Sequence, residues 1–86
     1  MQDFKKGFIE RLKSARLEVG FSQTGLARRI YVRRESVARW ETGITIPSAD
    51  NAALICKELD VSADWLLGLT KKKSTPNAAT FKDAQE

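Results

Sequence analysis

The 86-residue sequence contains no histidine, a single cysteine and no glycine-rich phosphate-binding loop. The lack of histidine removes the most common general base and the most common metal ligand. One cysteine excludes an internal disulfide and is too few for a zinc site. Because Cys56 lies in an apolar run over residues 52–56, we expect a buried structural thiol rather than a nucleophile. These absences argue against an enzyme and against a bound cofactor.

Long apolar runs are also absent. No stretch approaches the roughly 20 apolar residues that a membrane-spanning helix needs. The N-terminal segment MQDFKKGFIERLK carries charge in every turn and so lacks the apolar centre of a signal peptide. We therefore expect a cytoplasmic protein with no membrane partner, which agrees with the scarcity of cysteine.

Positive charge is concentrated in the first half of the chain. The net charge is +4, but residues 1–41 hold ten Lys/Arg against five Asp/Glu, whereas residues 42–70 hold one against four. Residues 71–86 hold four against two. This asymmetry suits either a face that binds a polyanion or a solvated basic surface, and charge alone does not separate the two.

Apolar residues recur with the period of an α-helix, and no convincing strand pattern is present. In the first predicted helix, Phe8, Leu12, Ala15 and Val19 share one face with Arg16. Serine caps and glycine stops divide the chain into predicted helices at about 4–19, 23–30, 34–42, 49–59 and 63–67. The sequence therefore predicts an all-α domain over residues 1–69 and a flexible polar tail over residues 70–86.

The segment over residues 22–43 carries the main functional signal. Its two short predicted helices are joined by about three residues, a connection that sets the second helix across the first and leaves its outer face exposed. The inner face would hold Val37, Trp40 and Glu41, and the outer face Arg33, Arg34, Glu35, Ala38 and Arg39. Arginine can donate two hydrogen bonds to guanine, glutamate can accept one from cytosine, and alanine leaves room for a thymine methyl. The pattern indicates a helix that reads base edges in double-stranded DNA.

An ordered set of residues strengthens this interpretation: Gln23 before Leu26-Ala27, then Val32, Val37, Trp40-Glu41 and Gly43, followed by Pro47-Ser48 and the closing VSADWLLGL. The set resembles the phage-repressor and Cro-type (XRE) helix-turn-helix family over roughly residues 8–69. The resemblance implies a five-helix, lambda-repressor-like domain that binds a double-stranded DNA operator. It further implies a transcriptional regulator, most simply a phage-like or prophage-like repressor that blocks polymerase.

The resemblance also implies roles for single residues. The matching positions Arg33, Arg34, Glu35 and Arg39 would reach base edges or nearby phosphates, and Ala38, from the outer face, would meet a base edge beside them. Phosphates would be contacted by Ser22, Gln23, Thr42 and Gly43, and Gln23 would also brace the recognition helix. It pairs Arg16 with Glu41, and the helical pattern agrees, because both charges fall on inward faces where a charge needs a partner. We therefore expect a buried Arg16–Glu41 ion pair with a structural role.

Four features depart from the family's pattern. Tyr31 stands where the turn usually has glycine, so either tyrosine adopts a left-handed conformation or the turn differs. Arg33 replaces the usual serine or threonine cap, which removes about 1 kcal/mol of helix stability but adds a cation near DNA. Gly25 is a weak helix former. The apolar loop over residues 44–46 predicts few phosphate contacts there.

The C-terminal part leaves alternatives open. A short helix in so small a domain cannot bury Trp65, Leu66, Leu67 and Leu69 together, which indicates either a homodimer contact, suited to a palindromic operator, or simple closure of the core. The run 71–73 (KKK) indicates a solubilising terminus or a DNA-contacting tail. Two other functions remain possible on sequence grounds: an antitoxin that also masks a toxin, and a protein-interaction module without DNA binding.

Overall fold

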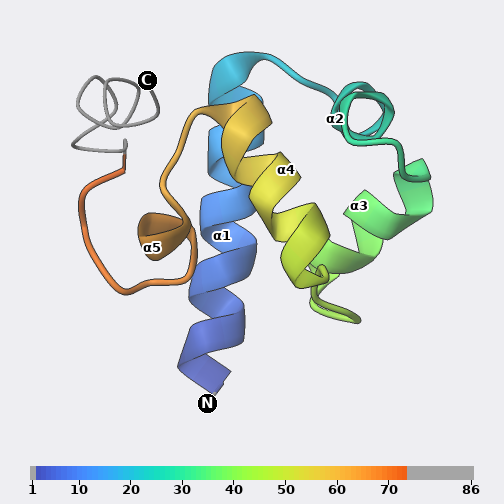
Figure 1. Ribbon diagram of the computed structural model, residues 1–86. Coiled ribbons are helices and arrows are strands. Elements are labelled where there is room, and N and C mark those ends of the chain that lie inside the picture. Colours follow the sequence, from blue (N-terminus) through green and yellow to red (C-terminus); the bar gives the residue numbers. More distant parts are fainter. Residues whose placement is uncertain (1, 74–86) are drawn as a thin grey trace.

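The computed structural model describes residues 2–73, and this part of the chain folds into five α-helices without β-strands (Figure 1). The helices are α1 (Gln2–Val19), α2 (Gln23–Arg29), α3 (Arg34–Thr42), α4 (Ala49–Leu59) and α5 (Ala63–Leu66). The all-α prediction is confirmed, although α1 begins two residues earlier than predicted, and α2 and α5 each end one residue earlier. Most of the predicted tail, residues 74–86, lies outside the described residues. No helix in the described part is long and apolar enough to cross a membrane.

Three serines begin helices as the sequence predicts. The Oγ atoms of Ser22, Ser48 and Ser62 each accept a hydrogen bond from the backbone N–H three residues later, at 2.9, 3.2 and 3.0 Å. Each bond satisfies a donor that the first turn of a helix would otherwise leave unpaired. The starts of α2, α4 and α5 are therefore set by local sequence.

The five helices of the described chain end in the same way. A residue with left-handed backbone follows each helix, and the next N–H donates to the carbonyl five residues earlier, at 2.7 to 3.0 Å. The left-handed residues are Gly20, Tyr31, Gly43, Asp60 and Gly68, with φ of 98°, 62°, 81°, 57° and 84°. Glycine adopts this conformation without steric cost, whereas a residue with a Cβ is strained by it. The use of Asp60 to end α4 was not predicted from the sequence.

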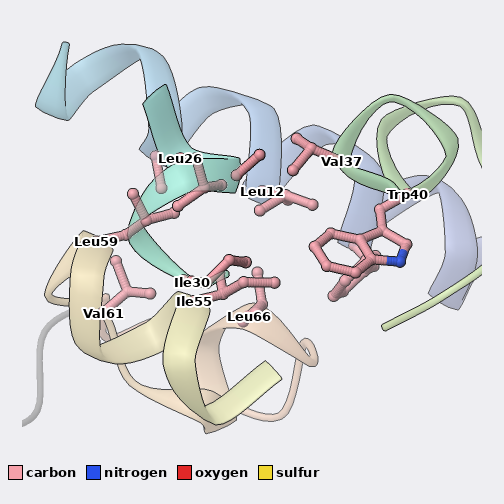
Figure 2. Packing of buried hydrophobic residues seen from close by; sticks show 12 residues of the cluster. Leu12, Leu26, Ile30, Val37, Trp40, Ile55, Leu59, Val61 and Leu66 are labelled. Atoms are coloured by element: carbon pink, nitrogen blue, oxygen red, sulfur yellow. The ribbon is translucent and has the colours of Figure 1, made fainter. Parts of the chain in front are cut away.

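One hydrophobic core joins all five helices (Figure 2). Each helix contributes a fully buried side chain to it: Leu12, Leu26, Val37, Ile55 and Leu66. α1 and α4 lie in the middle of the molecule, with α2 and α3 on one side and α5 on the other (Figure 1). This arrangement separates α3 from α5, so the two surfaces that the sequence marked as functional face different directions.

Cys56 is half-buried beside the core rather than fully buried as expected. Its side chain is nevertheless removed from much of the solvent, and this burial raises the pKa of the thiol because desolvation disfavours the thiolate. A thiol with a raised pKa is a poor nucleophile, which agrees with the structural role inferred from sequence.

The chain after α5 returns to the body of the domain. Lys72 and Lys73, which the sequence assigned to the flexible tail, contact the start of α5 and the last turn of α1. The N–H of Ser62 donates to the carbonyl of Lys73 at 2.8 Å. The ammonium of Lys73 pairs with Glu18 and lies 5.4 Å from the centre of the Trp65 ring. These contacts place Lys73 against the domain, whereas the sequence left it open between a solubilising terminus and a DNA-contacting tail.

The apolar residues near α5 divide as the sequence predicted. Leu66 is completely buried and Trp65 is partly buried, whereas Leu67 and Leu69 are 39% and 74% exposed. The short helix therefore closes the core with one leucine and leaves two at the surface.

Alanine at neighbouring positions should separate the two kinds of leucine. Leu66→Ala should lower the free energy of unfolding by about 2–5 kcal/mol, because it empties a fully buried site. Leu67→Ala should cost about 1 kcal/mol or less, because much of that side chain already contacts water. Urea denaturation followed by circular dichroism measures both, and equal losses would contradict the packing of α5.

Candidate nucleic-acid interface

The turn between α2 and α3 sets the direction of α3. The N–H of Val32 donates to the carbonyl of Ala27 at 3.0 Å, and the Val32 side chain packs against the core. Tyr31 has φ of 62°, so tyrosine adopts the left-handed conformation that a glycine would otherwise supply. Of the two outcomes left open by the sequence, the turn is kept and the tyrosine is strained.

The two faces of α3 differ in exposure. Val37, Trp40 and Glu41 are buried, and Trp40 is only 4% exposed, so it belongs to the core and is no platform for base stacking. On the other face the structure exposes Arg33, Arg34, Glu35 and Arg39, and leaves Ala38 partly buried. Three guanidinium groups and one carboxylate are thus exposed on α3 and on Arg33, its N-cap residue.

One arginine near this helix contacts other parts of the domain. The guanidinium of Arg29 lies 3.7 Å from a carboxylate oxygen of Glu58 and 5.1 Å from the centre of the Phe21 ring. These contacts connect Arg29 to α4 and to the loop before α2. Its side chain is still 60% exposed, so Arg29 adds to the positive surface charge beside α3.

Arg33 occupies the cap position of α3 and makes no side-chain cap. Its backbone carbonyl accepts from the N–H of Ser36 at 3.0 Å, but no side-chain oxygen satisfies the first turn. The loss of a cap that the sequence indicated is therefore real, and Arg33 instead points a cation outward.

The ion pair expected between Arg16 and Glu41 is present and buried. Arg16 donates from Nε to Glu41 Oε2 at 2.6 Å and from Nη2 to Oε1 at 2.9 Å, a two-bond geometry that fits a guanidinium to a carboxylate. Its Nη1 donates to the carbonyl of Phe21 at 2.8 Å. The pair joins the last turn of α1 to the last turn of α3 and to the loop before α2.

Gln23 connects this buried pair to the exposed face. Its Nε2 donates to Glu41 Oε1 at 3.1 Å, and its Oε1 accepts from Arg34 Nη1 at 3.4 Å. The side-chain amide at the start of α2 therefore contacts α3 near both of its ends. The resemblance implied that Gln23 contacts a phosphate and braces the recognition helix, and in the structure its amide links Arg34 to Glu41.

The other residues assigned to phosphates lie at helix ends. Ser22 Oγ already accepts the cap bond of α2, which leaves its O–H able to donate outward. At the end of α3, the N–H groups of Gly43 and Ile44 are bonded to the carbonyls of Trp40 and Arg39. The exposed hydroxyl of Thr42 donates to the carbonyl of Ala38 at 3.0 Å. The donors near Gly43 are thus engaged in closing α3.

Comparison with known proteins places this geometry in a family. Residues 12–66 match the helix-turn-helix family. The chain belongs to this family, in its phage-repressor and Cro-type (XRE) branch. Its members are DNA-binding transcriptional regulators rather than enzymes.

Two longer regulators are similar in sequence. The HTH-type transcriptional activator BcrR of Enterococcus faecalis is 33% identical over 60 residues, which is 70% of this chain and 29% of that protein. The HTH-type transcriptional regulator DicA of Escherichia coli (strain K12) is 32% identical over 68 residues, which is 78% of this chain and 50% of that protein. The chain spans half or less of the length of these two relatives.

A solved structure shares the fold. The P22 c2 repressor protein, crystallised in complex with a synthetic operator, superimposes with a TM-score of 0.69 and 27% sequence identity. The match covers 73% of this chain and 96% of that chain. The fold is therefore that of a lambda-repressor-like DNA-binding domain, as the sequence indicated.

The buried pair gives a clear expectation for stability. Arg16→Met leaves the Glu41 carboxylate buried without its cation and should lower the free energy of unfolding by about 3–5 kcal/mol. The double variant Arg16→Met/Glu41→Leu should recover much of this loss, since it removes both desolvated charges. Urea denaturation of the single and double variants completes the cycle. Losses that simply add would contradict a coupled pair.

Because the start of α3 lacks a side-chain cap, a capping residue at position 33 should stabilise the domain while removing one positive charge. Arg33→Ser restores a side-chain acceptor for the first turn and should raise the free energy of unfolding by about 1 kcal/mol. Arg33→Gln, which removes the same charge without an effective cap, is the control and should leave stability nearly unchanged. If the serine variant is no more stable than the glutamine variant in urea, the first turn of α3 is already satisfied.

Proposed function

We propose that this chain is a sequence-specific double-stranded DNA-binding repressor of transcription that places α3 in the major groove. The observation that carries the proposal is the exposed row of Arg34, Glu35 and Arg39 on a helix whose opposite face is fixed in the core. A rigid helix with outward donors and an acceptor has the chemistry needed to discriminate base pairs.

The proposed division of contacts follows the geometry. Arg34, Glu35 and Arg39 would meet base edges, with partly buried Ala38 close to the groove floor. Arg33, at the start of the helix, is suited either to a base edge or to the adjacent phosphate. Because Gln23 bonds to Arg34 and to buried Glu41, the position of Arg34 is supported from inside the domain.

Phosphate contacts would fix the domain on the duplex. Ser22 and Gln23 lie at the start of α2, where backbone N–H groups and the helix dipole favour an anion. At the other end of the interface, Thr42 and Gly43 close α3. The Thr42 hydroxyl and the Gly43 N–H both donate to carbonyls of the helix, so a phosphate contact there would require the hydroxyl to rotate away from Ala38. These contacts set orientation and carry no sequence information.

We further propose a cytoplasmic homodimeric repressor, and two observations support the dimer. A repressor of the same fold was crystallised with an operator, and two leucines beside α5 remain exposed. Two protomers would address half-sites about 34 Å apart on one side of the duplex. Occupation of a promoter in this way would block polymerase.

Selection from a random duplex pool tests sequence recognition directly. The bound pool should yield a preferred sequence, and a dimer should yield two related half-sites about one helical turn apart. A single half-site would contradict the dimer and leave base reading intact. A pool without preference would contradict sequence recognition itself.

Substitutions on α3 should then weaken binding to the selected duplex. Arg34→Ala and Arg39→Ala should each cost about 1–3 kcal/mol of binding free energy and relax specificity at one base pair. Lys57→Ala, at an exposed position of α4, changes the net charge equally and serves as the control, with little effect expected. Fluorescence anisotropy measures the affinity of each variant, and a salt series gives the dependence of that affinity on salt concentration. Arginine variants that bind like the lysine variant would refute the role of α3.

A further inference from the structure

Tyr31 is the only tyrosine of the chain and is 88% exposed at the turn between α2 and α3. Its backbone has φ of 62°, which strains any residue that carries a Cβ. Three of the five helices in the described part of the chain end with glycine at the equivalent position, where this strain is absent. Tyr31 thus combines a strained backbone with a large aromatic ring in water.

In the described packing around the turn, nothing requires tyrosine rather than glycine at position 31. The back-bond that ends α2 comes from the N–H of Val32, and glycine at position 31 would keep it. The other strained position, Asp60, carries a short polar side chain that tolerates left-handed backbone better than a bulky ring does. A strained, exposed residue of this kind is characteristic of a site that contacts a ligand.

The charges around Tyr31 indicate what that ligand is. It stands two residues before Arg33 and three before Arg34 at the start of α3, and exposed Arg28 lies in the last turn of α2. If α3 enters the major groove, the residue before its first turn lies at the edge of the groove, along the sugar-phosphate backbone. A phenolic O–H donates well to a phosphate oxygen, and the ring can pack against the adjoining sugar.

We propose that Tyr31 is a contact to the DNA backbone, with its hydroxyl donating to a phosphate oxygen beside the bases read by α3. The inference rests on the proposed function and adds a residue that the family resemblance did not assign. Because the phenol is neutral, this contact differs from the arginine contacts around it. It should add affinity without releasing a condensed cation from the duplex.

Tyr31→Gly and Tyr31→Phe test the proposal on the selected duplex and on a scrambled one. Tyr31→Gly should raise the urea midpoint, because it relieves the backbone strain, yet weaken binding to both duplexes by roughly fivefold or more. The slope of affinity against salt should stay at its wild-type value, since no cationic contact is lost. Tyr31→Phe keeps the strain and the ring, so it should lower affinity without any gain in stability.

Asp60→Gly is the matched control. It relieves left-handed strain at the end of α4, remote from α3, and should raise or preserve stability while leaving DNA affinity unchanged. Because it also removes one negative charge, its affinity is compared with that of Asp60→Asn. The pair of glycine variants therefore separates relief of strain from loss of a DNA contact.

A second measurement reports the contact itself. Because the chain has one tyrosine, ring labelling gives a single tyrosine signal in NMR spectra, and this signal should shift when the duplex is added. Wild-type affinity in Tyr31→Gly, or an unshifted signal, would overturn the proposal while leaving the role of α3 intact. Lost affinity with a reduced salt slope would also overturn it, because Tyr31 would then act by placing the arginines. Failure of the wild-type chain to bind any duplex would instead refute the proposed function.

Discussion

The two hydrogen bonds between Arg16 and Glu41 hold the domain and its exposed helix in one arrangement. Burying either charge alone is strongly unfavourable, so α1 and α3 must meet with the correct rotation for the guanidinium to face the carboxylate. The third donor of Arg16 fixes the loop before α2 through the carbonyl of Phe21. Gln23 then extends the network to Arg34. A polar interaction inside the protein thereby sets where an exposed side chain is presented.

At the start of α3, residues that expose large side chains on the outer face stand where other residues would make the turn and the helix more stable. Within four residues, the chain accepts a strained backbone at Tyr31 and an uncapped helix at Arg33, although glycine and serine would each be more stable there. The three serine caps and three glycine ends elsewhere show that the same chain follows these local rules at other helices. Asp60 is also left-handed, but the helix that follows it is capped by Ser62. The turn before α3 combines both departures, and such a combination is typical of a functional site.

Charge is distributed unevenly along the chain. Residues 1–41 carry the positive excess, and residues 42–70, which include α4 and α5, carry a negative one. In the described structure α3 lies on one side of α1 and α5 on the other (Figure 1). Such polarity orients a domain toward a polyanion before contact is made. The same arrangement of helices places the exposed leucines near α5 away from the face proposed to bind DNA.

Local sequence determined most of the fold: serine caps, glycine ends and the 3.6-residue period gave the helices and placed Trp40 and Glu41 inward. The exposed row of α3 followed from the same periodicity. Only the tertiary structure decided that Gln23 bridges Glu41 and Arg34, and that Lys72 and Lys73 contact Ser62. The physical reason is range: caps and periodicity depend on residues a few positions apart, whereas these contacts join groups that become neighbours only when the helices pack.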